Sequence, residues 1–166
     1  MRKSSRAATL GATLTVLCAG FAASGQATLD SLAVRAVAEV ETRSLEEGRE
    51  VVKLAPANRV VPGDQVIYTL EIRNTGRAAV ESPTVIYPVP NHLGYVADSA
   101  SGPGAEVSYS VDGGRTFDRP ENLRTAGPDG QLRTSNALEY THIRWKFKNN
   151  LKSHSVAFAR FRAVVK

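Results

Sequence analysis

Three histidines and many serines are the side chains in this sequence that could carry proton transfer, nucleophilic attack or metal binding. His92, His142 and His154 lie far apart in the sequence, and no cysteine or carboxylate cluster accompanies them. The short spacings that zinc ligands use are absent. The sequence also lacks a Gly-x-Ser-x-Gly elbow and a Gly-rich phosphate loop followed by lysine. We therefore expect no catalytic residue, no metal ion and no cofactor.

Positive charge gathers in the last 28 residues, where seven cations accompany a single acid, Glu139. In each of two segments the cations alternate with apolar residues, so in a strand they share one face. We predict a basic face that binds an anionic partner. Its residues are Arg144, Lys146 and Lys148 in the first segment and Arg160 and Arg162 in the second. The alternative is a solvated face whose cations lie beside Glu39 and Glu41 of a neighbouring first strand.

The first 27 residues have the pattern of a secretory signal peptide. Arg2, Lys3 and Arg6 precede an uncharged stretch over 7–23, and small residues follow it. We predict cleavage after Ala27, with cleavage after Gly25 as the alternative. The apolar stretch is about 17 residues long and rich in Ala, Gly and Thr, shorter than the roughly 20 residues that span a bilayer. We therefore expect no transmembrane anchor in the mature chain.

Cys18 raises the question of lipidation, because bacterial lipoproteins are cleaved just before a cysteine that then carries lipid. The residue before such a cysteine is small, whereas here it is Leu17. We expect Cys18 to leave with the signal peptide. The localisation we predict is export, to the periplasm, the cell surface or the medium.

Removing residues 1–27 changes the composition that matters for function. The remaining 139 residues have a net charge of +2 instead of the +5 of the full chain, and they contain neither Cys nor Met. No thiol is left for catalysis or for a disulfide. The low net charge and the lack of exposed stacking aromatics exclude nucleic acid as a partner. The partners we predict are an envelope protein or an anionic envelope polymer.

The elements that must position these residues are strands. Period-two alternation is clearest over 66–73 and 142–148, and turn signals recur about every ten residues. We predict a hairpin over 106–117 that turns at Asp112 and Gly113, followed by a long surface loop over 118–137. The other predicted strands cover 32–40, 50–54, 84–87, 93–97 and 156–165. The pattern predicts an all-β fold, an immunoglobulin-like β-sandwich of seven to nine strands that forms a single domain over 28–166.

Residues 58–98 contain a series of turn and strand motifs. These are Pro62-Gly63-Asp64, 68–72 with its Tyr68, Asn74-Thr75-Gly76, and Pro88-Val89-Pro90 followed by Leu93. With these motifs the segment resembles the bacterial family called domain of unknown function eleven. The resemblance implies an exported immunoglobulin-like module of the cell surface or periplasm, with Tyr68 packed inside. Two departures are Tyr87, where the family usually has Asp, and the single copy of a domain that is often repeated.

The segment Ser110 to Phe117 is similar to the Asp-box of sialidases and other β-propellers, with the pattern Ser-x-Asp-x-Gly-x-Thr-aromatic. The resemblance implies a structural hairpin remote from catalysis. One box cannot build a propeller. We expect Asp112 to hydrogen-bond its own turn.

These observations predict a non-enzymatic, exported structural or binding module of the bacterial cell envelope. It would present a sheet face, an open sheet edge, or the loops 91–104 and 118–136 to another envelope component. The first alternative is a small carbohydrate-binding domain, although alternation makes Trp145 a core residue. The second is a hydrolase, which would need His142 or His154 to meet a serine and an aspartate in one cleft.

Overall fold

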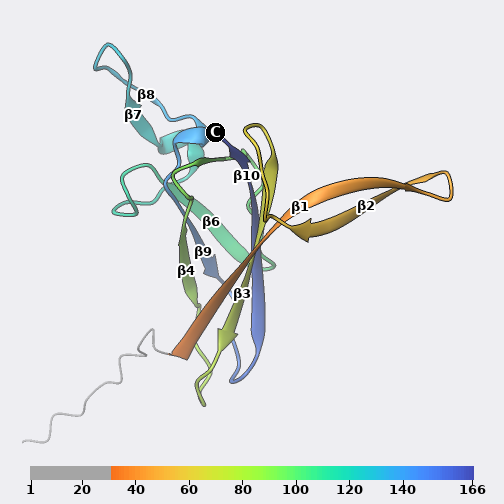
Figure 1. The fold of residues 1–166 in the computed structure, drawn as a ribbon. Helices are drawn as coiled ribbons and strands as arrows, with labels where there is room; N and C mark the ends of the chain where they lie inside the picture. The colour runs from red at the N-terminus through yellow and green to blue at the C-terminus, as the bar shows by residue number, and fades with distance from the viewer. Residues whose placement is uncertain (1–30) are drawn as a thin grey trace, which may run out of the picture.

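The computed structural model describes residues 31–166 and is built almost entirely of antiparallel strands (Figure 1). The predicted signal peptide, its cleavage site and Cys18 lie outside the described residues. Two sheets pack face to face, which confirms the predicted all-β sandwich class. No helix in the described part of the chain is long and apolar enough to cross a membrane.

The larger sheet has five strands in the order β2-β1-β3-β10-β5. β3 (Gln65–Asn74) and β10 (Val156–Val165) form its centre, and β1 (Leu32–Glu46) pairs with β3 from Leu32 to Val40. Alternation in β3 buries Leu70 and Ile72 on the inner face, as the sequence pattern requires of a half-buried strand. The remaining strands of this sheet are β2 (Arg49–Pro56) and β5 (Leu93–Tyr95).

The smaller sheet has three strands in the order β4-β9-β6. These strands are β4 (Thr84–Pro88), β9 (His142–Phe147) and β6 (Ala105–Ser110). Pro88 ends β4, which is an edge strand as its prolines predict. Ile143, Trp145 and Phe147 of β9 point into the core, where the Trp145 ring lies 6.1 Å from that of Phe161.

Tyr68 takes the inward position on β3 that the sequence predicts. Its ring stacks on Phe161 with centroids 4.9 Å apart and lies 6.2 Å from the ring of Tyr87. Burial raises the pKa of the Tyr68 hydroxyl above its usual value. Tyr87 therefore belongs to an aromatic contact with Tyr68 and Phe161 at the edge of the core.

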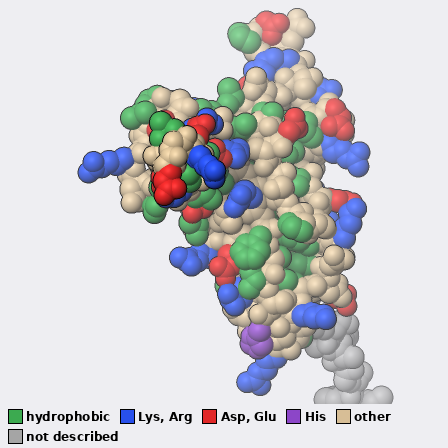
Figure 2. All heavy atoms as spheres, turned by 90° about the vertical axis from the view of Figure 1, so that its right-hand side faces the viewer, with side chains coloured by type: hydrophobic (Ala, Val, Ile, Leu, Met, Phe, Trp, Pro, Cys, Tyr) green, Lys and Arg blue, Asp and Glu red, His purple; other side chains and the backbone are tan. Residues whose placement is uncertain are grey.

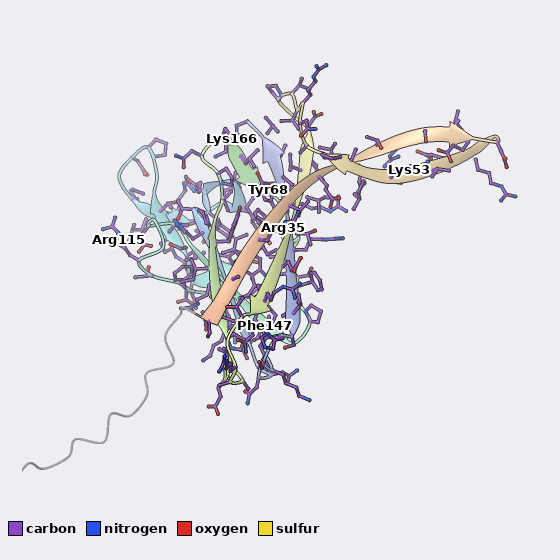
Figure 3. The ribbon with its side chains drawn as sticks, turned by 60° about the horizontal axis from the view of Figure 1, so that its bottom comes forward. Arg35, Lys53, Tyr68, Arg115, Phe147 and Lys166 are labelled. Atoms are coloured by element: carbon purple, nitrogen blue, oxygen red, sulfur yellow. The ribbon has the colours of Figure 1, made fainter. Side chains whose placement is uncertain are left out.

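A two-stranded arm projects from the sandwich and was not predicted. The sequence pattern predicts separate short strands over 32–40 and 50–54, whereas β1 continues to Glu46 and pairs with the whole of β2. The turn at its tip contains Glu47 and Gly48, both with positive φ. Beyond Val40, β1 has left β3 and pairs only with β2, so residues 41–54 form a ribbon that leads away from the body (Figures 1 and 3). We call residues 41–54 the arm.

The prediction of a surface loop over 118–137 is wrong in part, because this segment contains short strands and 3-10 turns. β7 (Arg124–Ala126) and β8 (Leu132–Thr134) form a small hairpin between the 3-10 turns η2 (Pro120–Asn122) and η3 (Ala137–Glu139). A capping box at Asn136 and a bidentate bond from Arg133 to Glu139 fix its base. The Arg133 guanidinium lowers the pKa of Glu139 to about 2. The predicted presenting loop over 91–104 likewise contains β5, whose three residues are buried.

Candidate functional site

The five cations of the predicted basic face lie on two different sheets. Arg144 and Lys146 are on the outer side of β9 and Lys148 follows directly, whereas Arg160 and Arg162 are on the outer side of β10. Because Trp145 of β9 and Phe161 of β10 face each other across the core, the outer sides of these strands point in opposite directions. The five residues therefore do not form one continuous face.

Ion pairs already occupy two of these five cations. Arg162 donates to Glu41 at 2.7 Å and Lys148 lies 3.2 Å from Glu106. The Glu41 contact agrees with the alternative in which acids of the first strand neutralise the cations, although β3 separates β1 from β10. Exposed pairs of this kind contribute little to stability, about 0 to 1 kcal/mol.

Arg144 and Lys146 line an open groove on the outer face of the smaller sheet, with a volume of about 330 Å³. One wall is the surface of β6 and β9, and the other is the segment 117–119 that follows the Asp112 turn. Three cationic side chains reach this groove, and in the described part of the chain none of them forms an ion pair. The lining residues are Glu106, Val107, Ser108, Phe117, Asp118, Arg119, Arg144 and Lys146.

Two neighbours hold the Arg144 side chain in place. Its guanidinium carbon lies 4.7 Å above the centroid of the Phe117 ring, a cation–π contact. Its Nε–H donates to Ser108 Oγ at 2.9 Å. These contacts leave the two terminal nitrogens without a hydrogen bond to any described residue. An arginine fixed in this way offers two adjacent donors to an oxyanion and loses little further side-chain freedom when it binds.

The two carboxylates in the groove are engaged elsewhere. Glu106 pairs with Lys148, while Asp118 accepts hydrogen bonds from the Asn122 side chain at 2.9 Å and the Arg119 backbone N–H at 2.7 Å. The Asn122 bond is the main reason that the pKa of Asp118 lies below its usual value. Both acids keep their charge, so the three cations Arg119, Arg144 and Lys146 exceed the two carboxylates of the groove by one positive charge.

The Asp112 turn positions Phe117 over Arg144. Asp112 accepts hydrogen bonds from the Thr116 hydroxyl at 2.6 Å and from the backbone N–H groups of Arg115 and Thr116. Gly113 and Gly114 have φ of 77° and 83°, and Tyr109 and Asp118 exchange two backbone bonds that close the loop. This confirms the expectation that Asp112 bonds its own turn.

We predict that Asp112→Ala loosens this turn and displaces Phe117 from Arg144. The bonds from Thr116 and Ser110 hold the pKa of Asp112 well below its usual value. Asp112 stabilises the turn only while its carboxylate is charged. The turn should therefore also loosen in the wild type as the pH falls below about 4, the ordinary pKa of an aspartate. Amide hydrogen exchange at Arg115 and Thr116 should accelerate at least tenfold in the variant. Asp129→Ala, in the β7–β8 turn, is the matched control. If exchange at Arg115 and Thr116 accelerated equally in this control, the role assigned to Asp112 would be contradicted.

Among the described residues no histidine side chain hydrogen-bonds to a serine or an aspartate, although Ser110 lies opposite His142 in the β6–β9 register. His142 Nδ1 lies 3.2 Å from Thr141 Oγ1, and the nearby Ser110 hydroxyl donates to Asp112 instead. His154 sits in the turn before β10 with a φ of 59°. Within residues 31–166 no group of three or more His, Cys, Asp and Glu is placed to hold a metal ion. Trp145 is fully buried and does not offer a sugar platform.

Of the eight residues that line the groove, the sequence predicted only Arg144 and Lys146 as site residues, and it missed Ser108, Phe117 and Arg119, which hold or flank Arg144. Ser108 lies opposite Arg144 in the β6–β9 register. A correct pairing of these two predicted strands would therefore have identified it. Phe117 and Arg119 follow the turn, and their approach to β9 depends on how that turn folds back. No local pattern specifies that approach.

Comparison of the chain with protein-family models, with curated proteins and with solved structures finds no match. The resemblance to domain of unknown function eleven therefore stays a prediction.

Proposed function

We propose that this protein is a non-enzymatic, exported binding module of the bacterial cell envelope, and that its groove at Arg144 holds carboxylate or phosphate groups of an anionic envelope polymer. The observation that carries the proposal is the Arg144 guanidinium, fixed by Phe117 and Ser108 with its terminal nitrogens free. Lys146 and Arg119 flank it in an open groove. Export is predicted from the pattern of residues 1–27.

The shape of the groove favours a polymer over a small metabolite. It is shallow and open along β6 and β9, so repeating anionic groups can occupy it while the rest of the polymer stays in solvent. The three cations of the groove exceed its two carboxylates by one positive charge, which attracts such a chain, and salt weakens this attraction because the side chains are partly exposed. The sandwich would then attach to an envelope layer through several weak contacts with the polymer.

The test measures binding of the purified protein to three polymers by calorimetry. These are alginate, which carries carboxylates, teichoic acid, which carries phosphates, and dextran, which is neutral. We expect binding to one or both anionic polymers that weakens with added salt. Arg144→Gln should lower the affinity about tenfold or more, the loss expected for charge-assisted hydrogen bonds of about 1.5 to 3 kcal/mol.

Arg77→Gln is the matched control, because Arg77 is an exposed arginine in the β3–β4 loop. It removes the same charge and should leave the affinity unchanged within about twofold. An equal loss in both variants would mean nonspecific attraction to the net charge and would contradict the groove. Equal binding of dextran would favour the alternative of a carbohydrate-binding domain.

A further inference from the structure

The arm carries three of its four large apolar side chains on one face, and the fourth, Val51, lies on the other. In the β1–β2 register Arg43 lies opposite Val52, Leu45 opposite Glu50 and Glu41 opposite Leu54, so these six residues share a face. Leu45, Val52 and Leu54 are 79%, 52% and 43% exposed. We call these six residues the arm face. Exposed apolar side chains on a projecting ribbon mark a surface that binds another molecule.

A second exposed apolar surface lies on the outer face of the five-stranded sheet. Val37 of β1 and Phe158 of β10 belong to this face, with 37% and 52% of their surface exposed. The arm face continues from it, because residues 37, 41, 43 and 45 lie on the same side of β1. Figure 2 looks onto this side of the molecule and shows hydrophobic side chains gathered beside the projecting arm.

The arm root bends toward this outer face. Glu41 at the start of the arm reaches Arg162 of β10 across β3, at 2.7 Å. A hollow lined by Val40, Glu41, Arg43, Asp64, Gln65 and Arg162 lies in the corner. The arm and the sheet therefore form the two sides of a concave angle, each side with apolar residues.

The two surfaces differ in the sign of their unpaired charge. The arm carries four acids against three bases, and Glu46 and Glu50 pair with Lys53 and Arg43 within it, so Glu47 is the acid of the tip that forms no ion pair in the described chain. The outer face of the sheet carries four arginines and also Glu39 and Glu71, and two of these arginines, Arg35 and Arg160, form no ion pair within the described chain. A tip carboxylate placed beside Arg35 or Arg160 would be attracted to it.

We propose that two copies of this chain form a symmetric dimer in which the arm of each lies across the outer face of the five-stranded sheet of the other. Both complementary surfaces belong to one chain, which is the condition for a two-fold interface. Two concave angles related by a two-fold axis can interlock so that each arm covers the sheet of its partner. Val37 and Phe158 then pack against the apolar arm residues of the second copy.

The size of the surfaces supports reciprocal contact. An arm of this length is roughly 20 Å long and roughly 10 Å wide from strand geometry. Two arms on two sheets bury roughly 800 Å² in total, the size of small, transient interfaces, whereas one arm alone buries about half of that. An interface of this size indicates a reversible dimer that uses both arms.

The test is sedimentation velocity of the full chain with Cys18→Ser, over a wide concentration range. We expect a dimer whose dissociation constant rises at least about tenfold in Leu45→Asp and in Phe158→Asp, one change on each surface. Leu132→Asp is the matched control, because Leu132 is 74% exposed on the β7–β8 hairpin, away from both surfaces. A monomer at every concentration, or an equal effect of Leu132→Asp, would overturn the proposal.

A photo-reactive benzophenone amino acid at position 45 identifies the contact. We expect cross-links to outer-face residues of β3 and β10 in a second copy. Cross-links from arm to arm would indicate pairing of the free β2 edges and would contradict the reciprocal arrangement. Binding to lipid vesicles with no dimer in solution would assign the arm to a membrane surface and would also overturn it. None of these outcomes depends on the groove at Arg144.

Discussion

Trp145→Ala is expected to destabilise the protein by about 3 to 5 kcal/mol, which is a large part of the stability of a domain of this size. The Trp145 side chain is fully buried between the sheets, next to Phe161. Its Nε1–H donates to the Ser101 carbonyl at 3.1 Å, so truncation leaves a cavity and also removes a hydrogen bond. Urea unfolding followed by circular dichroism measures the change.

Trp145→Phe serves as the control for this prediction. It keeps an aromatic ring in the core and loses only part of the volume together with the bond to Ser101, so its destabilisation should be clearly smaller. A Trp145→Ala protein that keeps its unfolding midpoint but no longer binds glycans would contradict a core role. That result would return Trp145 to the carbohydrate-binding alternative.

Asn74→Ala is expected to have the second largest effect, a loss of about 2 to 4 kcal/mol. Asn74 is fully buried, and its side-chain amide donates to the carbonyls of Ala78 at 2.8 Å and Leu151 at 2.9 Å. Its Oδ1 accepts the Gly76 N–H at 2.9 Å. Truncation removes three hydrogen bonds to the backbone, one of them buried and two part-buried, although the Leu151 carbonyl keeps its bond from the Val80 N–H. Unpaired buried groups cost about 1 to 3 kcal/mol each before relaxation and water offset part of it.

The exposed Asn150 is the comparison for this second prediction. Asn150→Ala should change the urea midpoint very little, because the Asn150 side chain lies at the surface. Equal midpoints for Asn74→Ala and the wild type would show that water replaces these hydrogen bonds without cost. The stabilising role that we assign to Asn74 would then be wrong.

Asn74 also shows where sequence reasoning reached the right place for the wrong reason. Asn and Gly are turn signals because they tolerate positive φ, yet neither Asn74 nor Gly76 has positive φ. The turn instead depends on the buried Asn74 amide. Gly76 is needed because a Cβ there would lie 2.9 Å from the Cβ of Ser31. Contacts of this kind join residues distant in the sequence, and local turn rules do not contain them.

The strands of the core were predictable because their inner residues alternate with polar ones. Ile143, Trp145 and Phe147 alternate in the sequence and are all buried. The arm was missed because residues 41–48 lack this alternation: their strand pairing is only with β2, and all of them are exposed. A ribbon without a core beneath it has no burial pattern to detect.

The basic face was predicted as one surface because alternation reports the side of a strand but not the sheet to which the strand belongs. Arg144 and Arg160 each lie outward as expected, on opposite sheets. Sheet membership depends on pairings such as β3 with β10, which join residues about 90 positions apart. The groove at Arg144 depends in addition on the Asp112 turn, which brings Phe117 back to β9.

The most direct test of the proposed function is a titration of isotope-labelled protein with alginate oligosaccharides, followed by amide chemical shifts. We predict that the shifts that change gather around the groove, at Ser108, Phe117, Arg119, Arg144 and Lys146, and that added salt reverses them. Changes confined to the outer face of β10 near Arg160, or no change with either alginate or teichoic acid fragments, would contradict an anion-binding role for the groove.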